Sequence, residues 1–404
     1  MVTKKRVLIT VLTILLVVLV FCPKVFSQGK IVIAANAVLD LRNRGFDSDG
    51  ILEVTGEYEL YLNRTLLPED FQNILPEVIT PEYVNYHKRR GPDKPDKNDF
   101  TAGEILTLRL RINVSPTESK KALRFFDFGF PCRIFVNGIN ITPYDKTDAL
   151  SANHALYIRN NIIAVEGHLT EIEIIIHAPS QEFYKYGPWQ TITIGAEQLV
   201  REHQLKKNAV DLFFFGSLMI MALYHIGIFL LRRKERSPLY FAFACFFGAV
   251  YSITVGERFA FILFPSLNWT GLILLIYFSS FLMLTALMKF IQTLFPEGFN
   301  ALFSSVLQVG VLIALGILAI APQGYYEALF TILYLLATIA FIYILFVIVK
   351  STVRKEDGAF YFLTGFVVLF ACGINDMLVQ KDILDNGMYI SMGLYFVIFS
   401  QALF

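Results

Sequence analysis

The spacing of apolar residues changes in character about halfway along the chain. In the first half, apolar residues recur at every second position in short runs, as at Leu106, Leu108, Leu110, Ile112 and Val114. Such alternation is typical of a strand with one buried and one solvated face. In the second half, apolar residues fill runs of about 20, the length of a helix that crosses a bilayer. The pattern therefore predicts an all-β domain followed by a transmembrane helix bundle.

Residues 28–195 contain several more runs of this kind and little that favours helix. Asn137-Gly138 between two apolar runs predicts a hairpin, because these residues accept the positive φ angles of a type I′ turn. Seven or more short strands are best buried in a β-sandwich. The expected strands cover residues 57–62, 106–114, 123–128, 133–141, 157–165, 172–176 and 192–194.

The second half is expected to hold seven spans. An amphipathic segment at 196–207, AEQLVREHQLKK, precedes them and is expected to be a short linker helix. The predicted membrane domain covers 208–404, with spans at 208–231, 238–255, 269–294, 301–321, 328–349, 358–379 and 388–404.

Lysine and arginine are distributed unevenly over the connections between these spans. Alternate connections hold eight basic residues, in 232–236, at Lys289 and in 350–355, whereas the others hold only Arg258 and Lys381. Basic connections stay in the cytoplasm. With seven spans, the β-domain is therefore expected outside the cytoplasm and the C-terminus inside, in a multi-pass membrane protein.

The N-terminus agrees with export of the β-domain. Lys4, Lys5 and Arg6 precede an apolar run from Val7 to Phe21. This run is short for a membrane span, so residues 1–27 are expected to be a cleaved signal peptide, with an uncleaved anchor as the alternative. A cut near Ser27 leaves Cys132 as the one cysteine of the exported domain, which rules out a disulfide within it.

Composition and motifs exclude several classes of function. Net charge is +1 at pH 7, so the basic excess of a general nucleic-acid binder is missing. The histidines are scattered, and no nucleophile elbow, phosphate-binding loop or paired-cysteine motif occurs. We therefore expect no enzyme, metal or cofactor in this chain. Its partners are expected to include the lipid bilayer, with a homodimer left open.

Candidate functional residues fall into two groups. Tyr184, Tyr186 and Trp189 cluster between two predicted strands, where their rings could bind a small ligand or simply pack at the sandwich edge. Polar residues inside or beside the spans are costly in lipid and are relay candidates by default. Those singled out are Asp211, His225, Glu257, Arg258, Asn375 and Asp376.

Several of these membrane residues could have a structural role instead of a role in signal relay. Asp211 lies near the start of the first span, where a carboxylate favours a helix N-terminus. His225 could respond to protonation or form an interhelical hydrogen bond. Asn375 and Asp376 lie about a turn from the outer end of the sixth span and could meet Arg258, and Glu257-Arg258 is itself a salt-bridge element.

Several stretches resemble the bacterial seven-transmembrane receptors with diverse intracellular signalling modules. Gly56-Glu-Tyr-Glu-Leu-Tyr61 resembles the opening of the family's extracellular domain, and Ile134-Phe-Val-Asn-Gly138 resembles its hairpin. The strongest resemblance runs from Leu212-Phe-Phe-Phe-Gly through Leu223-Tyr-His225 to Gly256-Glu-Arg258, at the start of the membrane domain.

The resemblance implies a jelly-roll sensor domain, similar to carbohydrate-binding modules, and a bundle that relays ligand binding inward. Family members usually continue into a kinase, cyclase or phosphatase, so an effector is expected beyond this chain. A transporter or channel with a substrate-capturing domain is the alternative, and an adhesive envelope protein is a third. Paired broken helices typical of transporters are not evident in the sequence.

Overall fold

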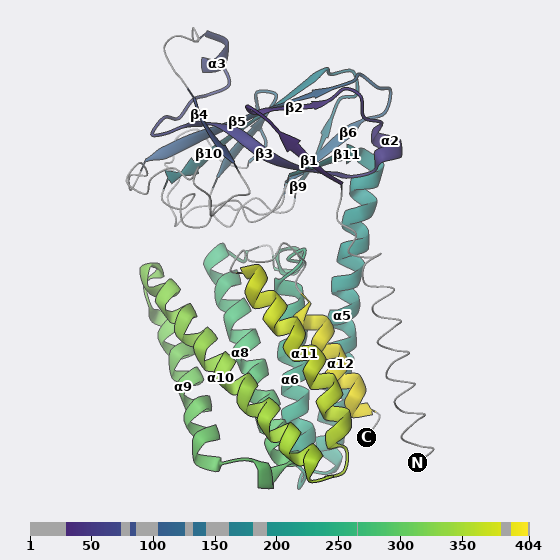
Figure 1. The fold of residues 1–404 in the computed structure, drawn as a ribbon, viewed down its shortest axis with the longest axis vertical. Helices are drawn as coiled ribbons and strands as arrows, with labels where there is room; N and C mark the ends of the chain where they lie inside the picture. Colours follow the sequence, from purple (N-terminus) through teal and green to yellow (C-terminus); the bar gives the residue numbers. More distant parts are fainter. Residues whose placement is uncertain are drawn as a thin grey trace. The chain divides into compact units, whose positions relative to one another are not determined.

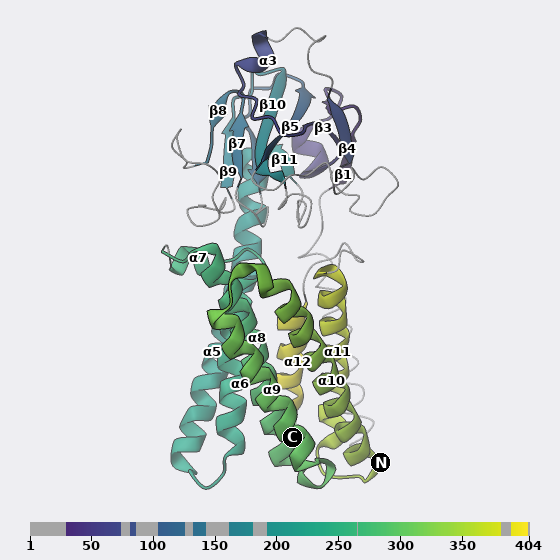
Figure 2. The ribbon, with the colours of Figure 1, turned by 90° about the vertical axis from the view of Figure 1, so that its left-hand side faces the viewer.

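The computed structural model describes residues 30–73, 81–85, 104–125, 132–142, 161–180, 192–264, 266–380 and 389–402. They form two compact units that divide between Lys206 and Lys207. The first unit consists mainly of strands and the second of helices (Figures 1 and 2). This confirms the predicted fold class, an all-β domain followed by a bundle of apolar helices.

Eleven strands are present in the described part of the first unit, largely antiparallel. Two short helices, α2 (Phe46–Asp49) and α3 (Asp70–Asn73), lie between them. The strands are β1 Lys30–Ala34, β2 Val38–Leu41, β3 Leu52–Tyr61, β4 Glu82–Asn85, β5 Ile105–Val114, β6 Lys121–Phe125, β7 Arg133–Val136, β8 Ile139–Asn140, β9 Asn161–Val165, β10 Glu171–Pro179 and β11 Ile192–Ala196.

Strand β3 belongs to both halves of this curved sheet. Its N-terminal residues Leu52–Val54 pair with β11, which continues to β6 and β9. Its C-terminal residues Glu59–Tyr61 pair with β5, which continues to β10, β7 and β8. The alternating apolar residues of both halves meet in a single core. Each fully buried Leu or Ile there contributes about 1.5–3 kcal/mol of hydrophobic stabilisation.

The predicted hairpin at Asn137-Gly138 is confirmed. These two residues join β7 to β8 with φ angles of 49° and 80°, in the left-handed region that Asn and Gly tolerate. The strand expected at 123–128 is described as far as Phe125, and the strand expected at 157–165 is described from Asn161.

The second unit is a bundle of long apolar helices. Helix α5 runs without a break from Glu197 to Leu231, so it covers both the expected linker and the expected first span. Six of the described helices, α5, α6, α8, α9, α10 and α11, are long and apolar enough to cross a membrane. After α5, the described α-helices of the bundle are α6 Ser237–Thr254, α7 Ala260–Leu263, α8 Trp269–Leu294, α9 Ala301–Ile320, α10 Tyr326–Val353, α11 Ala359–Gln380 and α12 Ile390–Ala402.

Glycines allow the last helices of the bundle to pack closely. A Cβ on Gly393 of α12 would lie 2.9 Å from Leu369 Cα of α11, and a Cβ on Gly365 of α11 would meet Ser400 of α12. Small residues commonly bring membrane helices together in this way, because lipid offers no hydrophobic force to pull them together. The small residues thus let α11 and α12 approach closely enough for van der Waals packing between their backbones to stabilise the pair.

Candidate functional site

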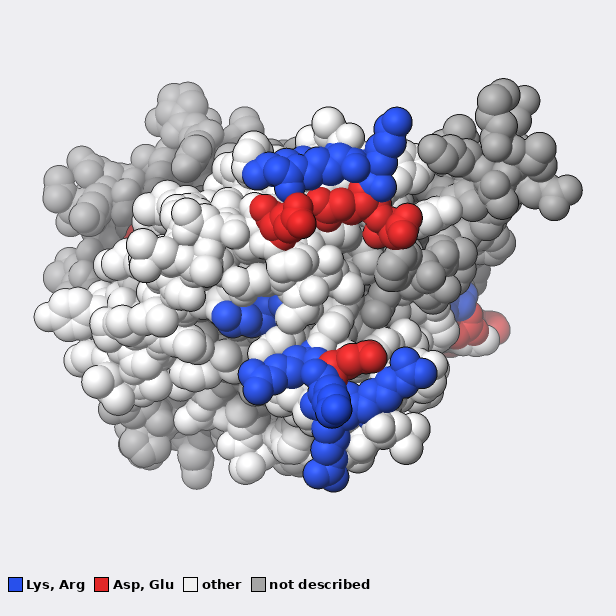
Figure 3. All heavy atoms as spheres, turned by 90° about the horizontal axis from the view of Figure 1, so that it is seen from below, with Lys and Arg blue, Asp and Glu red and all other residues white. Residues whose placement is uncertain are grey.

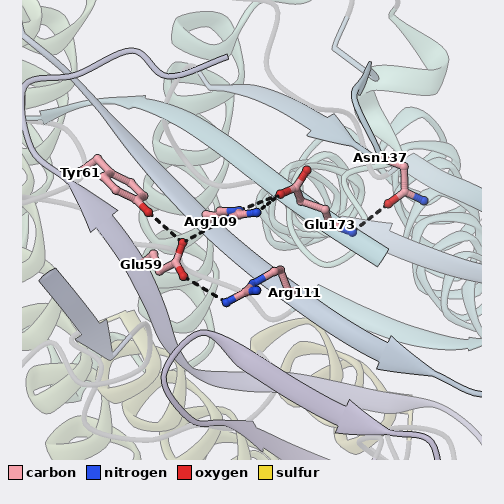
Figure 4. A network of polar contacts seen from close by, with 6 residues as sticks. All are labelled: Glu59, Tyr61, Arg109, Arg111, Asn137 and Glu173. Carbon is pink, nitrogen blue, oxygen red and sulfur yellow. Dashed lines mark hydrogen bonds and ion pairs between the residues drawn. The ribbon is translucent and has the colours of Figure 1, made fainter. Parts of the chain in front are cut away.

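Four charged side chains form an ion-pair network on one face of the sheet, across the adjacent strands β3, β5 and β10 (Figure 4). Arg109 lies at its centre, with Nε 2.7 Å and Nη2 2.6 Å from Glu173 Oε1 and Nη1 3.4 Å from Glu59 Oε2. Arg111 Nη2 lies 3.5 Å from the other Glu59 oxygen. Alternate residues of a strand share a face, so the β3 and β10 carboxylates meet the two β5 guanidiniums. The network is electrically balanced.

Two aromatic rings close one side of this network. Tyr61 donates its hydroxyl hydrogen to Glu59 Oε2 at 2.9 Å. The Phe71 ring packs edge-on against Tyr61, with centroids 5.4 Å apart, and its centroid lies 4.4 Å from Arg109 Cζ. A guanidinium over an aromatic face is stabilised by the ring quadrupole, and more strongly when water is excluded.

The segment that carries Phe71 follows β3 and folds back over this face of the sheet. We call residues 62–73 the cover segment. Its Leu66 amide donates to Thr107 Oγ1 at 3.0 Å, and the Leu66 carbonyl oxygen lies 2.8 Å from His177 Nε2. Thr107 and His177 are consequently buried. The fully solvated face predicted for the 106–114 strand is therefore wrong at Thr107, because a distant segment covers it.

An open pocket of about 300 Å³ adjoins the network. It is lined by Pro68, Asn137, Gly138, Glu171 and Glu173. Asn137 Oδ1 accepts the backbone N–H of Glu173 at 2.8 Å, which fixes the hairpin turn against β10. The exposed Glu171 carboxylate can accept hydrogen bonds from hydroxyl or amino groups of a small ligand. The lining is mainly polar, with Pro68 as its apolar side chain.

The aromatic residues predicted to bind a ligand, Tyr184, Tyr186 and Trp189, lie outside the described residues. Within the residues that the structure describes, no three His, Cys, Asp or Glu side chains lie close enough together to hold a metal ion. The four charged groups of the ion-pair network are paired with one another.

Two of the predicted relay residues, Asp211 and Glu257, meet in the membrane domain. The Glu257 amide donates to Asp211 Oδ2 at 3.0 Å, and Lys207 Nζ lies 3.9 Å from Glu257 Oε1. Gly256 has φ +63°, and a Cβ there would lie 2.8 Å from Asp211 Oδ2, so only glycine fits. Arg258 follows in the same turn, also with positive φ. Helix α5 is thereby bonded to the connection between α6 and α7.

Asp376 binds the N-terminus of α12. Its two carboxylate oxygens accept the amide hydrogens of Tyr389 at 2.7 Å and Ile390 at 3.0 Å, and Asn375 Nδ2 donates to it at 3.3 Å. A carboxylate here satisfies helix-terminal amides and interacts favourably with the helix dipole. The side chain is buried, so this capping contact explains how a carboxylate is accommodated inside the bundle.

His225 makes its hydrogen bond within α5. Nδ1 lies 2.9 Å from the Met221 carbonyl oxygen, one turn earlier, and the ring packs 4.6 Å from the Phe241 ring of α6. The structure thus places the imidazole at the α5–α6 contact. This hydrogen bond joins the imidazole to its own helix, and the ring contact joins it to α6.

Some polar contacts of the bundle involve residues that the sequence did not single out. Tyr277 of α8 and Tyr334 of α10 place their hydroxyl oxygens 3.0 Å apart, and Tyr277 stacks on Phe330 with ring centroids 3.8 Å apart. Tyrosine is common near membrane interfaces, so its presence gives no signal of such a contact.

In the β-domain, the sequence did not single out Glu59 and Glu173 of the ion-pair network. Their alternation with apolar residues nevertheless marks both as lying on the polar face of the sheet.

The helical unit matches one known family of membrane domains. Residues 207–404 match a family model described as 7TM diverse intracellular signalling. No curated protein and no solved structure gives a significant match to the chain. The family match covers all six membrane-crossing helices except the first ten residues of α5, as well as α12.

Proposed function

Since residues 207–404 belong to the 7TM diverse intracellular signalling family, we propose that this transmembrane signalling receptor senses a small ligand outside the cytoplasm and passes the signal to a cytoplasmic effector. The family match is the observation that carries the proposal. The strand-rich unit that precedes the bundle is of the kind that serves as a sensor domain.

The proposed orientation puts the β-domain outside the bacterial inner membrane. The support is the excess of Lys and Arg in the connections α5–α6 and α10–α11, and basic connections favour the cytoplasmic side. Helix α5 enters the bundle from the β-domain, so the sensor then lies on the side opposite the α5–α6 connection.

We propose the pocket beside the ion-pair network as the ligand site. Glu171 and Asn137 offer hydrogen-bond acceptors at its edge, which suits a carbohydrate or another small molecule with several hydroxyl groups. Tyr184, Tyr186 and Trp189 are proposed separately as ligand contacts of the β-domain, because aromatic rings can stack on a small ligand. The paired Arg109 and Glu173 give the pocket a rigid floor.

Helix α5 is the proposed path of the signal. Its first turn is fixed to the β-domain, since Val200 is buried there and the Glu197 amide donates to the Lys120 carbonyl at 3.0 Å. Its later turns carry Asp211, which binds the Glu257 amide. A ligand can shift this helix only if it binds two arrangements of the protein with different affinity.

Thermal shift of the full chain in nanodiscs, screened against sugars, peptides and envelope fragments, tests the sensor. A true ligand raises the unfolding temperature of the wild type but not of an E171Q variant. Glu118, which lies on an exposed turn, provides the control E118Q, which should keep the response. If every compound leaves the wild type unchanged, or E118Q loses the response as E171Q does, the proposed site is wrong.

Amide hydrogen exchange with and without that ligand tests the relay. Binding should change exchange in residues 255–263, next to Asp211, and E171Q should abolish the change. A ligand that stabilises only the β-domain and leaves 255–263 unaffected would contradict relay through α5. Solute flux through proteoliposomes that contain the chain would instead support the transporter alternative.

A further inference from the structure

The connection between α5 and α6 concentrates positive charge. Residues 232–236 are all exposed and comprise Arg232, Arg233, Lys234, Glu235 and Arg236. Arg232 Nη1 lies 4.0 Å from Glu235 Oε1, at the limit of an ion pair. Within the described part of the chain, the other three basic side chains form no ion pair. The connection therefore carries three positive charges in excess.

The second basic group at this end of the bundle is neutralised. Figure 3 views this end and shows one row of basic side chains lined by acidic ones, and another group in which basic side chains dominate. Around the α10–α11 connection, Arg354 Nη1 lies 3.4 Å from Glu297 Oε2, and two further carboxylates follow in sequence. That group comprises Lys350, Arg354, Lys355, Glu297, Glu356 and Asp357.

The short connection holds its charges at the level of the lipid headgroups. It has five residues between two membrane-crossing helices. The preceding Leu231 is 88% exposed, as expected for a side chain at the edge of the hydrocarbon. A headgroup layer is only about 5–7 Å thick on each side of a bilayer. Side chains of Arg and Lys in a turn this short therefore lie among the headgroups rather than beyond them.

The backbone of the turn favours an anion as well. The Glu235 amide donates to the Arg232 carbonyl at 3.0 Å, which closes the turn and gathers the basic side chains. Helix α6 begins at Ser237 with a proline in its first turn and no side-chain cap. Its free N-terminal amides add positive potential beside Arg236, a combination suited to phosphate.

We propose that the α5–α6 connection is a binding surface for the phosphate groups of anionic phospholipids. The excess charge and the uncapped helix start favour an anionic phosphate, and the position in the headgroup layer favours a lipid headgroup over a protein partner. Arginine contacts phosphate through two parallel hydrogen bonds, and three of the four basic residues are arginines. The inference is independent of the ligand and effector assigned above.

Native mass spectrometry of the purified full chain tests this surface, with phosphatidylglycerol and phosphatidylcholine titrated in parallel. The wild type should retain phosphatidylglycerol in preference to phosphatidylcholine. Each basic residue near an anionic surface changes affinity about fivefold, so R232Q/R233Q/K234Q/R236Q should lose the preference. The control K350Q/R354Q/K355Q removes charges at the same end and should keep it.

A variant with added positive charge distinguishes a specific loss of lipid binding from a loss caused by misfolding. E235K should strengthen phosphatidylglycerol binding about fivefold or more, which a misfolded variant cannot do. Added glycerol phosphate should not compete, because it lacks the acyl chains that hold a headgroup at this depth. The proposal is overturned if glycerol phosphate displaces the lipid, if the control loses the preference equally, or if the glutamine variant keeps its preference for phosphatidylglycerol.

Discussion

Among single residues, Glu59 joins both arginines of the ion-pair network on the sheet face. It is nearly buried and accepts contacts from Arg109, Arg111 and Tyr61. Glu59→Gln leaves two guanidiniums short of a partner in a partly water-excluded site, so we expect a loss of about 2 kcal/mol of unfolding free energy. Chemical unfolding of the β-domain measures it. Glu166→Gln, which removes an exposed pair with Lys120, should change stability little.

His177 makes the β-domain sensitive to acid. Burial lowers the pKa of its imidazole, although its contact with the Leu66 carbonyl partly opposes this. In the unfolded chain the imidazole of His177 has the ordinary histidine pKa of about 6.5, so it binds a proton more readily there than in the folded domain. Stability should therefore fall as pH drops below about 6.5. Unfolding curves between pH 7.5 and 5.5 check this, and His177→Gln should flatten the dependence while His168→Gln, at an exposed site, should not.

At the level of elements, small residues bring α11 and α12 close together. A Cβ on Gly393 would lie 2.9 Å from Leu369 Cα and 3.0 Å from Cys372 Cβ. Gly393→Val should push the helices apart and cost about 2 kcal/mol. The same change at Gly316 of α9, where nothing lies within 4 Å of the new Cβ, should be tolerated. Thermal unfolding in nanodiscs compares the two, and equal losses would show that the packing is not the cause.

Elements with a local signal were predictable, and contacts between distant elements were not. Alternation marked β5, and Asn137-Gly138 marked the hairpin, because both depend on neighbouring residues. Burial of Thr107 depends on Leu66, which lies 41 residues away and binds through its backbone amide. A backbone contact leaves no trace in residue type, so the cover segment could not be inferred from the pattern.

The membrane residues show the same division. Hydropathy singled out Asp211 and Asp376, since carboxylates are rare in apolar runs. It could not reveal that Asp211 binds the Glu257 amide or that Asp376 caps α12, because those partners are main-chain groups brought close by helix packing. Both contacts stabilise connections of the bundle, so a substitution there tests structure and relay together.

For the whole molecule, the distribution of basic residues predicts which end of the bundle faces the cytoplasm. Glu235 lies in the α5–α6 connection, and Gly324 lies in the α9–α10 connection at the other end, with open space around a Cβ. In spheroplasts, a membrane-impermeant thiol reagent should label G324C. It should label E235C only after the membrane is permeabilised. The wild type measures the background labelling, including any from Cys22; the cysteines within the described residues, Cys132, Cys245 and Cys372, are buried. Labelling of E235C alone would contradict the proposed orientation, because it would show that the sensor domain lies in the cytoplasm.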